Sequence, residues 1–201
     1  MNPRLVPLAA LLGSLALAAC DSDPQVTVRA TLDGAPVADL PVRLLPYDRE
    51  ELLESLASAA RSPEPAIPPE LLQQLQGLPA AEREARARGD TALARFQAMR
   101  RVLFARADSV RAARREWAQA TYAAFDSLAA RRAETAGRLE AVDTTDASGT
   151  VNFEAKPARW WVYARYTLPH SELYWNLPVE VAGDSTVVEL TRANARERPF
   201  L

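Results

Sequence analysis

The sequence contains a single cysteine, Cys20, and a single histidine, His170, among its 201 residues. One cysteine cannot form a disulfide within the chain, so stability must come from a packed core. One histidine and one cysteine also fall short of the four nitrogen and sulfur ligands that usually hold a structural zinc ion. We therefore expect no metal site and no cofactor.

Sequence signals for catalysis are equally scarce. His170 lies between Pro169 and Ser171 in a segment typical of a loop, and no serine has the flanking glycines of a nucleophile elbow. Asp143 and Asp146 lack the spacing of a calcium-binding loop. The net charge of −2 gives no general reason to expect a nucleic-acid partner. We expect a protein that is not an enzyme.

The first 20 residues carry the strongest sequence signal. Arg4 precedes an apolar run over residues 5–16, which is shorter than the roughly 20 residues of a membrane-spanning helix and typical of a secretory signal. The run ends in Leu17-Ala18-Ala19-Cys20, which resembles the lipobox of bacterial lipoproteins.

This resemblance implies that residues 1–19 are a signal peptide that is cleaved and that Cys20 carries the lipid. Residues 20–24 then form a tether to a membrane of the bacterial cell envelope, with the protein facing the periplasm or the exterior. More than one acyl chain is needed for stable anchoring, and a diacylated cysteine supplies two. The alternative is an ordinary secretory signal followed by a thiol at Cys20.

Residues 25–47 and 139–194 alternate between apolar and polar side chains, which is typical of half-buried strands. We expect two strands in the first segment, four in the second, and a C-terminal tail over residues 195–201. The two groups of strands can pair only if the residues between them return the chain to its starting point. The sequence therefore predicts an α+β protein, an antiparallel β-sandwich with a helical insertion between its second and third strands.

The intervening residues 48–138 have helical periodicity. Asp48 is placed to cap the first helix, and prolines between residues 63 and 69 break it. A short helix is expected to stop at Gly77, and another to begin at Pro79.

From residue 90 to residue 136 there is no glycine or proline, which predicts one helix of about 70 Å. Its apolar residues recur every seven positions and form a seam that needs a partner helix, at Phe96, Leu103, Val110 and Trp117. We predict an antiparallel helical hairpin that turns near Gly89. A break near Asp108, giving a compact bundle, is the alternative.

Two short motifs resemble the carboxypeptidase regulatory-like domain family. Gly34-Ala35-Pro36-Val37 leads to Pro41-Val42-Arg43-Leu44, and Thr145-Asp146-Ala147-Ser148-Gly149 leads to Phe153. The resemblance covers about half of the chain after Cys20 and implies a small Ig-like or transthyretin-like β-sandwich. Such domains are non-catalytic modules of bacterial envelope proteins, and the long helical insertion departs from their pattern.

Two groups of side chains are candidates for contact with a partner or a glycan. In strands that alternate, one of Trp160 and Trp161 must face outward, and Trp161, Tyr163 and Tyr174 are the outward aromatic candidates. Such rings can stack on sugars, or they can pack against the base of the helices. The second group is Arg100, Arg101, Arg114 and Arg115, which is either a solvated face or a surface for an acidic partner.

The sequence thus favours a lipid-anchored structural protein of the envelope, with the sandwich near the membrane and a helical hairpin that docks another protein. The alternative is a carbohydrate- or cell-wall-binding module that uses the outward aromatic residues.

Overall fold

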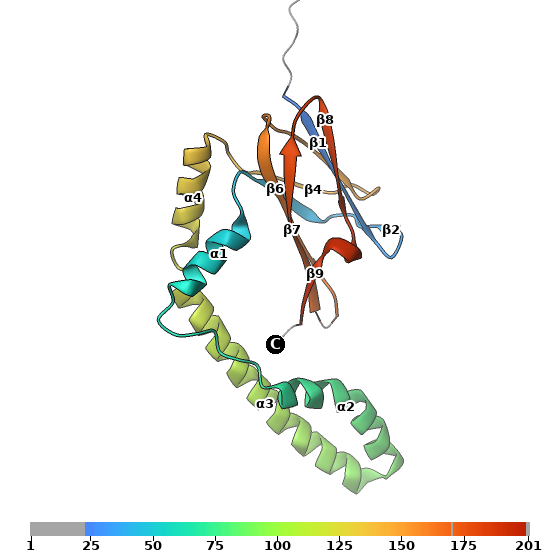
Figure 1. Cartoon of the computed structure of the whole chain (residues 1–201). Helices are drawn as coiled ribbons and strands as arrows, with labels where there is room; N and C mark the ends of the chain where they lie inside the picture. Colours follow the sequence, from blue (N-terminus) through green and yellow to red (C-terminus); the bar gives the residue numbers. More distant parts are fainter. Residues whose placement is uncertain (1–22, 170, 200–201) are drawn as a thin grey trace, which may run out of the picture.

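The computed structural model describes residues 23–169 and 171–199 and shows an α+β protein with two β-sheets and four α-helices (Figure 1). The helices are α1 (Arg49–Ser58), α2 (Pro69–Ala87), α3 (Asp90–Thr121) and α4 (Phe125–Ala136). The strands are β1 (Gln25–Leu32), β2 (Ala35–Pro36), β3 (Pro41–Leu45), β4 (Ala141–Thr144), β5 (Thr150–Glu154), β6 (Ala158–Thr167), β7 (Ser171–Val181), β8 (Ser185–Leu190) and β9 (Arg196–Pro199). Cys20, the expected signal peptide and His170 lie outside the described residues.

Each sheet combines strands from both sides of the helical segment. In the smaller sheet, β1 pairs with β5 and β8, and the two-residue β2 extends from its end. The larger sheet has the order β4-β3-β6-β7-β9. Strands β1 and β3 precede the helices, whereas β5 and β6 follow them.

Several details of the sheets differ from the sequence-based prediction. Strands β2 and β4 were not expected, so the two segments hold three and five strands instead of two and four. The β1–β8 pair is parallel, whereas the other pairs are antiparallel. Strands β7 and β8 lie in different sheets, so the connection between them crosses from the larger sheet to the smaller one. Part of the expected C-terminal tail is strand β9, because its residues pair with residues 171–174 of β7.

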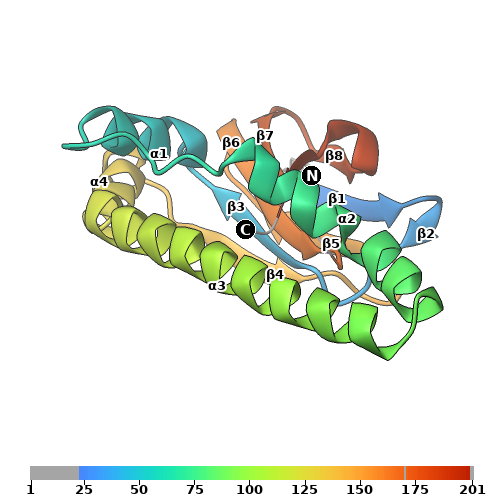
Figure 2. The same ribbon diagram turned by 90° about the horizontal axis from the view of Figure 1, so that it is seen from below.

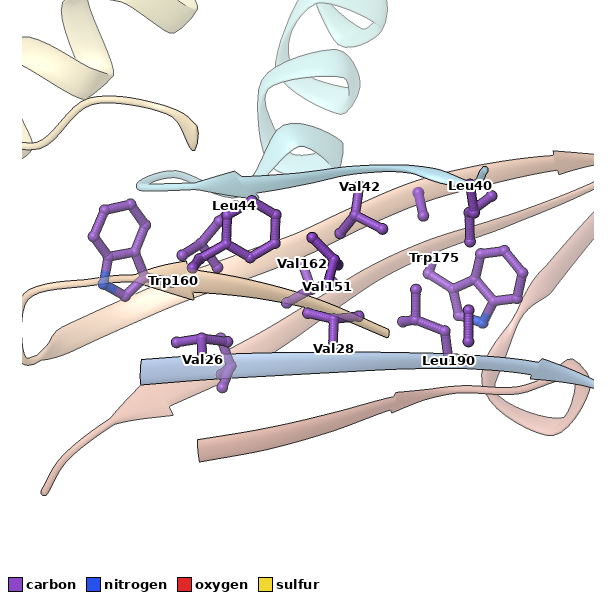
Figure 3. Packing of buried hydrophobic residues seen from close by; sticks show 14 of the residues in the cluster. Val26, Val28, Leu40, Val42, Leu44, Val151, Trp160, Val162, Trp175 and Leu190 are labelled. Atoms are coloured by element: carbon purple, nitrogen blue, oxygen red, sulfur yellow. The ribbon is translucent and has the colours of Figure 1, made fainter. Parts of the chain in front are cut away.

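The main core lies between the two sheets (Figure 3). Alternate residues of β1 and β3 point into it, and Val26, Val28, Val42 and Leu44 are at most 1% exposed. The same alternation in β6 and β7 buries one tryptophan from each strand, Trp160 and Trp175. The two indole rings lie at opposite ends of the labelled cluster in Figure 3.

The helical segment is a hairpin that turns at Gly89, but its returning arm is broken. Gly89 has φ of 94°, which favours glycine, and α2 packs against α3 on either side of it. The helix continues through Asp108 and ends at Thr121, so neither one continuous helix to residue 136 nor a break near Asp108 is correct. The short α4 then bends away from the direction of α3 and runs beside α1 along the larger sheet (Figures 1 and 2).

The outgoing arm of the hairpin also differs from the prediction of two helices separated near Gly77. Instead, α2 is one helix that contains both Gly77 and Pro79. Figure 1 shows that α2 changes direction partway along its length, as expected where a proline removes one hydrogen bond of the helix.

Candidate functional site

Helices α1 and α4 cover part of the outer face of the larger sheet. Alternation with the buried Trp160 and Val162 turns Trp161 and Tyr163 toward this face. Both rings are half-buried and pack against a second core cluster that the two helices form with the sheet, consisting of Leu45, Tyr47, Leu52, Ala129 and Ala133. The aromatic residues therefore pack at the base of the helices, and Trp161 and Tyr163 do not form an open platform.

Tyr174 also faces away from the main core but is only 6% exposed. The guanidinium of Arg198 lies 3.9 Å from the centre of its ring. One Nη atom of Arg198 donates a hydrogen bond of 2.8 Å to the Tyr174 hydroxyl. The tyrosine face is therefore already stacked on an arginine.

Helix α1 is fixed at its N-terminus to strands β7 and β9. The Asp48 carboxylate accepts hydrogen bonds from the backbone N–H groups of Glu50 and Glu51 and from the side-chain amide of Asn176. The Glu50 carboxylate is 2.6 Å from an Nη atom of Arg196. These contacts hold the first turn of α1 over the sheet.

A polar pocket of about 300 Å³ opens between α1 and this end of the sheet. Its charged lining residues are Arg49, Glu50, Glu54, Arg165, Glu172, Arg196 and Arg198, and its aromatic lining residues are Tyr122, Tyr163 and Tyr174. The sequence had singled out Tyr163 and Tyr174, but not the four arginines. The alternating Arg196 and Arg198, at a period of two, were the only sequence signal for them.

The four arginines expected on the long helix do not form one site. Arg114 forms an ion pair with Glu64 and donates a hydrogen bond of 2.9 Å to the backbone oxygen of Pro65, which ties α3 to the α1–α2 connection. The Arg100 guanidinium lies 6.0 Å from the Phe96 ring centre on the same helix. Arg101 and Arg115 are exposed.

The apolar seam of α3 is largely internal. Phe96 and Leu103 are buried, and Leu103 packs with Ala107 against Leu71 of α2. Val110 is half-buried at the edge of this cluster, and Trp117 donates a hydrogen bond of 2.8 Å from Nε1 to the backbone oxygen of Ser62. The partner that the seam requires is therefore the outgoing arm of the same hairpin.

An apolar groove remains on the outside of the α2–α3 pair. It has a volume of about 450 Å³ and is lined by Gln74, Gly77, Leu78, Ala81, Met99, Val102, Leu103 and Arg106. Met99 is 50% exposed and Val102 is 71% exposed. We refer to this feature as the distal groove, since Figure 1 shows the α2–α3 pair extending away from the sheets.

No protein-family model, curated protein or solved structure matches the chain. In the described part of the chain, no three histidine, cysteine, aspartate or glutamate side chains lie together where they could hold a metal ion. No helix in that part is both long and apolar enough to cross a membrane.

Proposed function

We propose that the protein is a non-catalytic lipoprotein of the bacterial cell envelope that docks another envelope protein in its distal groove. The exposure of Met99 and Val102 beside Leu78 and Ala81 carries this proposal. Apolar side chains that line one groove, rather than being scattered singly, mark surfaces that other proteins cover.

The two ends of the molecule suit such a role. Figure 1 places the start of β1 at one end and the α2–α3 turn at the other. In our proposal the lipid is carried by Cys20, only a few residues before β1. The sheets would then lie near the membrane, and the distal groove would face away from it.

The finer fold that we propose is a transthyretin-like sandwich of the carboxypeptidase regulatory-like type, with residues 48–138 inserted. The turn at Asp146 supports it. One Oδ atom of Asp146 accepts hydrogen bonds from the backbone N–H groups of Ser148 and Thr150, and Gly149 has φ of 76°. The motif that suggested the family thus forms a closed turn into β5.

A photo-crosslinking amino acid placed at Val102 in the full chain, expressed in cells of its source, tests the docking role. We expect one dominant adduct with an envelope protein, identified by mass spectrometry. The matched control is Val187 on β8, which is 52% exposed but lies on the smaller sheet. An adduct from Val187 of the same identity and yield, or no adduct from Val102, would refute docking at the groove.

The lipid anchor is tested separately with Cys20→Ala. In the variant, the lipoprotein pathway should not cleave the signal peptide. The variant should also no longer partition into detergent, because no acyl chain is attached. An unmodified thiol at Cys20 in the native protein would contradict this part of the proposal.

A further inference from the structure

We infer that the pocket between α1 and the larger sheet binds a small organic anion, a carboxylate or phosphate carried on a group of about one sugar ring. We call it the arginine pocket. Its volume of about 300 Å³ is at the lower end of the range for small-molecule sites, about 300–1,000 Å³. This inference does not depend on the docking function, because the pocket and the distal groove have no lining residue in common.

Two of the four arginines are held by aromatic rings. The Arg49 guanidinium lies 4.6 Å from the ring centre of Tyr163 and 5.1 Å from that of Phe125. Arg198 is stacked in the same way on Tyr174. These ring contacts restrict where the two guanidinium groups can lie, and Arg198 also donates one Nη hydrogen bond to the Tyr174 hydroxyl. Both arginines line the pocket, and their remaining N–H donors can bind an anion there.

The other two arginines, Arg165 and Arg196, form close ion pairs with carboxylates of the pocket. Arg165 lies 3.2 Å from Glu172, and Arg196 lies 2.6 Å from Glu50. Among residues 23–169 and 171–199, no carboxylate lies within 4 Å of Arg49. The nearest one to Arg198 is Glu50, at 3.8 Å, which is too long for a hydrogen bond.

The net charge of the lining side chains is positive. Four arginines face three glutamates, and the two arginines in contact with aromatic rings, Arg49 and Arg198, are the two without a hydrogen bond to a carboxylate of the described residues. Arginine binds carboxylates and phosphates through two parallel N–H donors. The ring of the ligand would lie against the exposed part of Tyr122 or Tyr163, both of which are half-buried.

Isothermal titration calorimetry on the protein from residue 20 onward tests this inference. The probes are glucuronate, glucose 6-phosphate, glucose and inorganic phosphate. We expect binding of at least one of the two sugar anions, weaker binding of inorganic phosphate, and no binding of glucose. Glucuronate and glucose 6-phosphate distinguish a carboxylate from a phosphate ligand. Affinity should fall with added salt, since the attraction is electrostatic.

Two pocket variants, Arg49→Gln and Arg198→Gln, should each weaken binding about tenfold or more, because each loses a hydrogen bond to a charged group. Arg101→Gln, which removes an exposed arginine from α3, is the matched control and should bind as the wild type does. Circular dichroism checks that each variant is folded, and Arg198→Lys provides a milder change if Arg198→Gln is not. Glucose bound as tightly as the anions, inorganic phosphate bound as tightly as the sugar anions, no binding of any probe, or equal affinity in the pocket variants and the control would overturn the inference.

Discussion

Replacing Trp117 by alanine tests whether the hairpin is held to the rest of the molecule by its own contacts. Trp117 is half-buried between α3 and the α1–α2 connection. Its indole nitrogen donates to the backbone oxygen of Ser62, and its ring meets Tyr122 edge-on at 5.5 Å between centres. Three contributions are therefore lost together: apolar burial, an aromatic pair and a hydrogen bond.

The magnitude follows from the partial burial. A fully buried tryptophan costs about 3–5 kcal/mol when it is cut back to alanine, and half of that is about 2 kcal/mol. The aromatic pair adds about 0.5 kcal/mol or more. The Ser62 carbonyl can bind water instead, so the lost hydrogen bond adds at most about 1 kcal/mol. We expect a loss of about 2.5–3.5 kcal/mol in the free energy of unfolding, or about 5–14 °C in Tm for a chain of this size.

Thermal unfolding of the purified protein from residue 20 onward, followed by circular dichroism at 222 nm, measures the effect. Trp117→Phe keeps an aromatic ring beside Tyr122 but removes the hydrogen bond, so its Tm should lie between those of the wild type and Trp117→Ala. A Tm for Trp117→Ala within about 2 °C of the wild type would refute the reasoning. It would show that the ring contributes less than about 1 kcal/mol to the stability of the isolated protein.

Three further predictions concern backbone and side-chain contacts of the sheets and are measured by urea denaturation. Gly149→Ala should lower the free energy of unfolding by about 3 kcal/mol or more, because φ is 76° and a Cβ atom would lie 2.5 Å from the backbone oxygen of Ala30. Gly183→Ala, at φ of 83° in open space, should lower it by only about 1 kcal/mol. Asp48→Ala should cost about 1–2 kcal/mol through loss of the helix cap, and Asp48→Asn should restore most of it. Burial raises the pKa of Tyr47 above its ordinary value of 10, so the folded state retains a proton that the unfolded state loses. The resulting stability is fully present below pH 10 and declines as the pH rises above it, and a Tyr47→Phe variant should show a shallower decline between about pH 10 and 11.5.

The elements that the sequence predicted well are those with local signals. Residues 150–154 alternate strictly and follow a turn with a glycine at positive φ, and they form β5 as predicted. Asp48 caps α1, and Gly89 sits at the turn of the hairpin. At each of these places a backbone requirement is met by only a few residue types, so the sequence indicates the local structure directly.

The break between α3 and α4 has no such signal. Tyr122, Ala123 and Ala124 are all compatible with a helix, and no glycine or proline marks the change of direction. Tertiary packing stabilises the break, because the turn brings Ala129 and Ala133 of α4 onto Leu45 and Leu52. Pro79 is the opposite case, since a residue that commonly breaks helices lies inside α2, whose packing on α3 through Leu71 and Leu75 maintains the helix.

The arginine pocket was beyond sequence reasoning for a related reason. Its charged residues come from α1, β6, β7 and β9. More than 100 residues of the chain separate Arg49 on α1 from Arg165 on β6. Only the register of β7 with β9 places Arg196 opposite Tyr174, and only the capped start of α1 places Arg49 above Tyr163. Pairings across a sheet are not encoded in any single segment.

The same helix that forms the distal groove also connects it to the sheets. Helix α3 runs without interruption from Gly89 to the Tyr122 turn, and Tyr122 itself lines the arginine pocket. Near that end, α3 is held by Arg114 and Trp117, which both bond to the connection between α1 and α2. A small shift of α3 would therefore move Tyr122 relative to Tyr163 and Arg49. If a ligand of the pocket and a protein in the distal groove each bind more tightly in one position of α3, each would change the affinity of the other by the same factor.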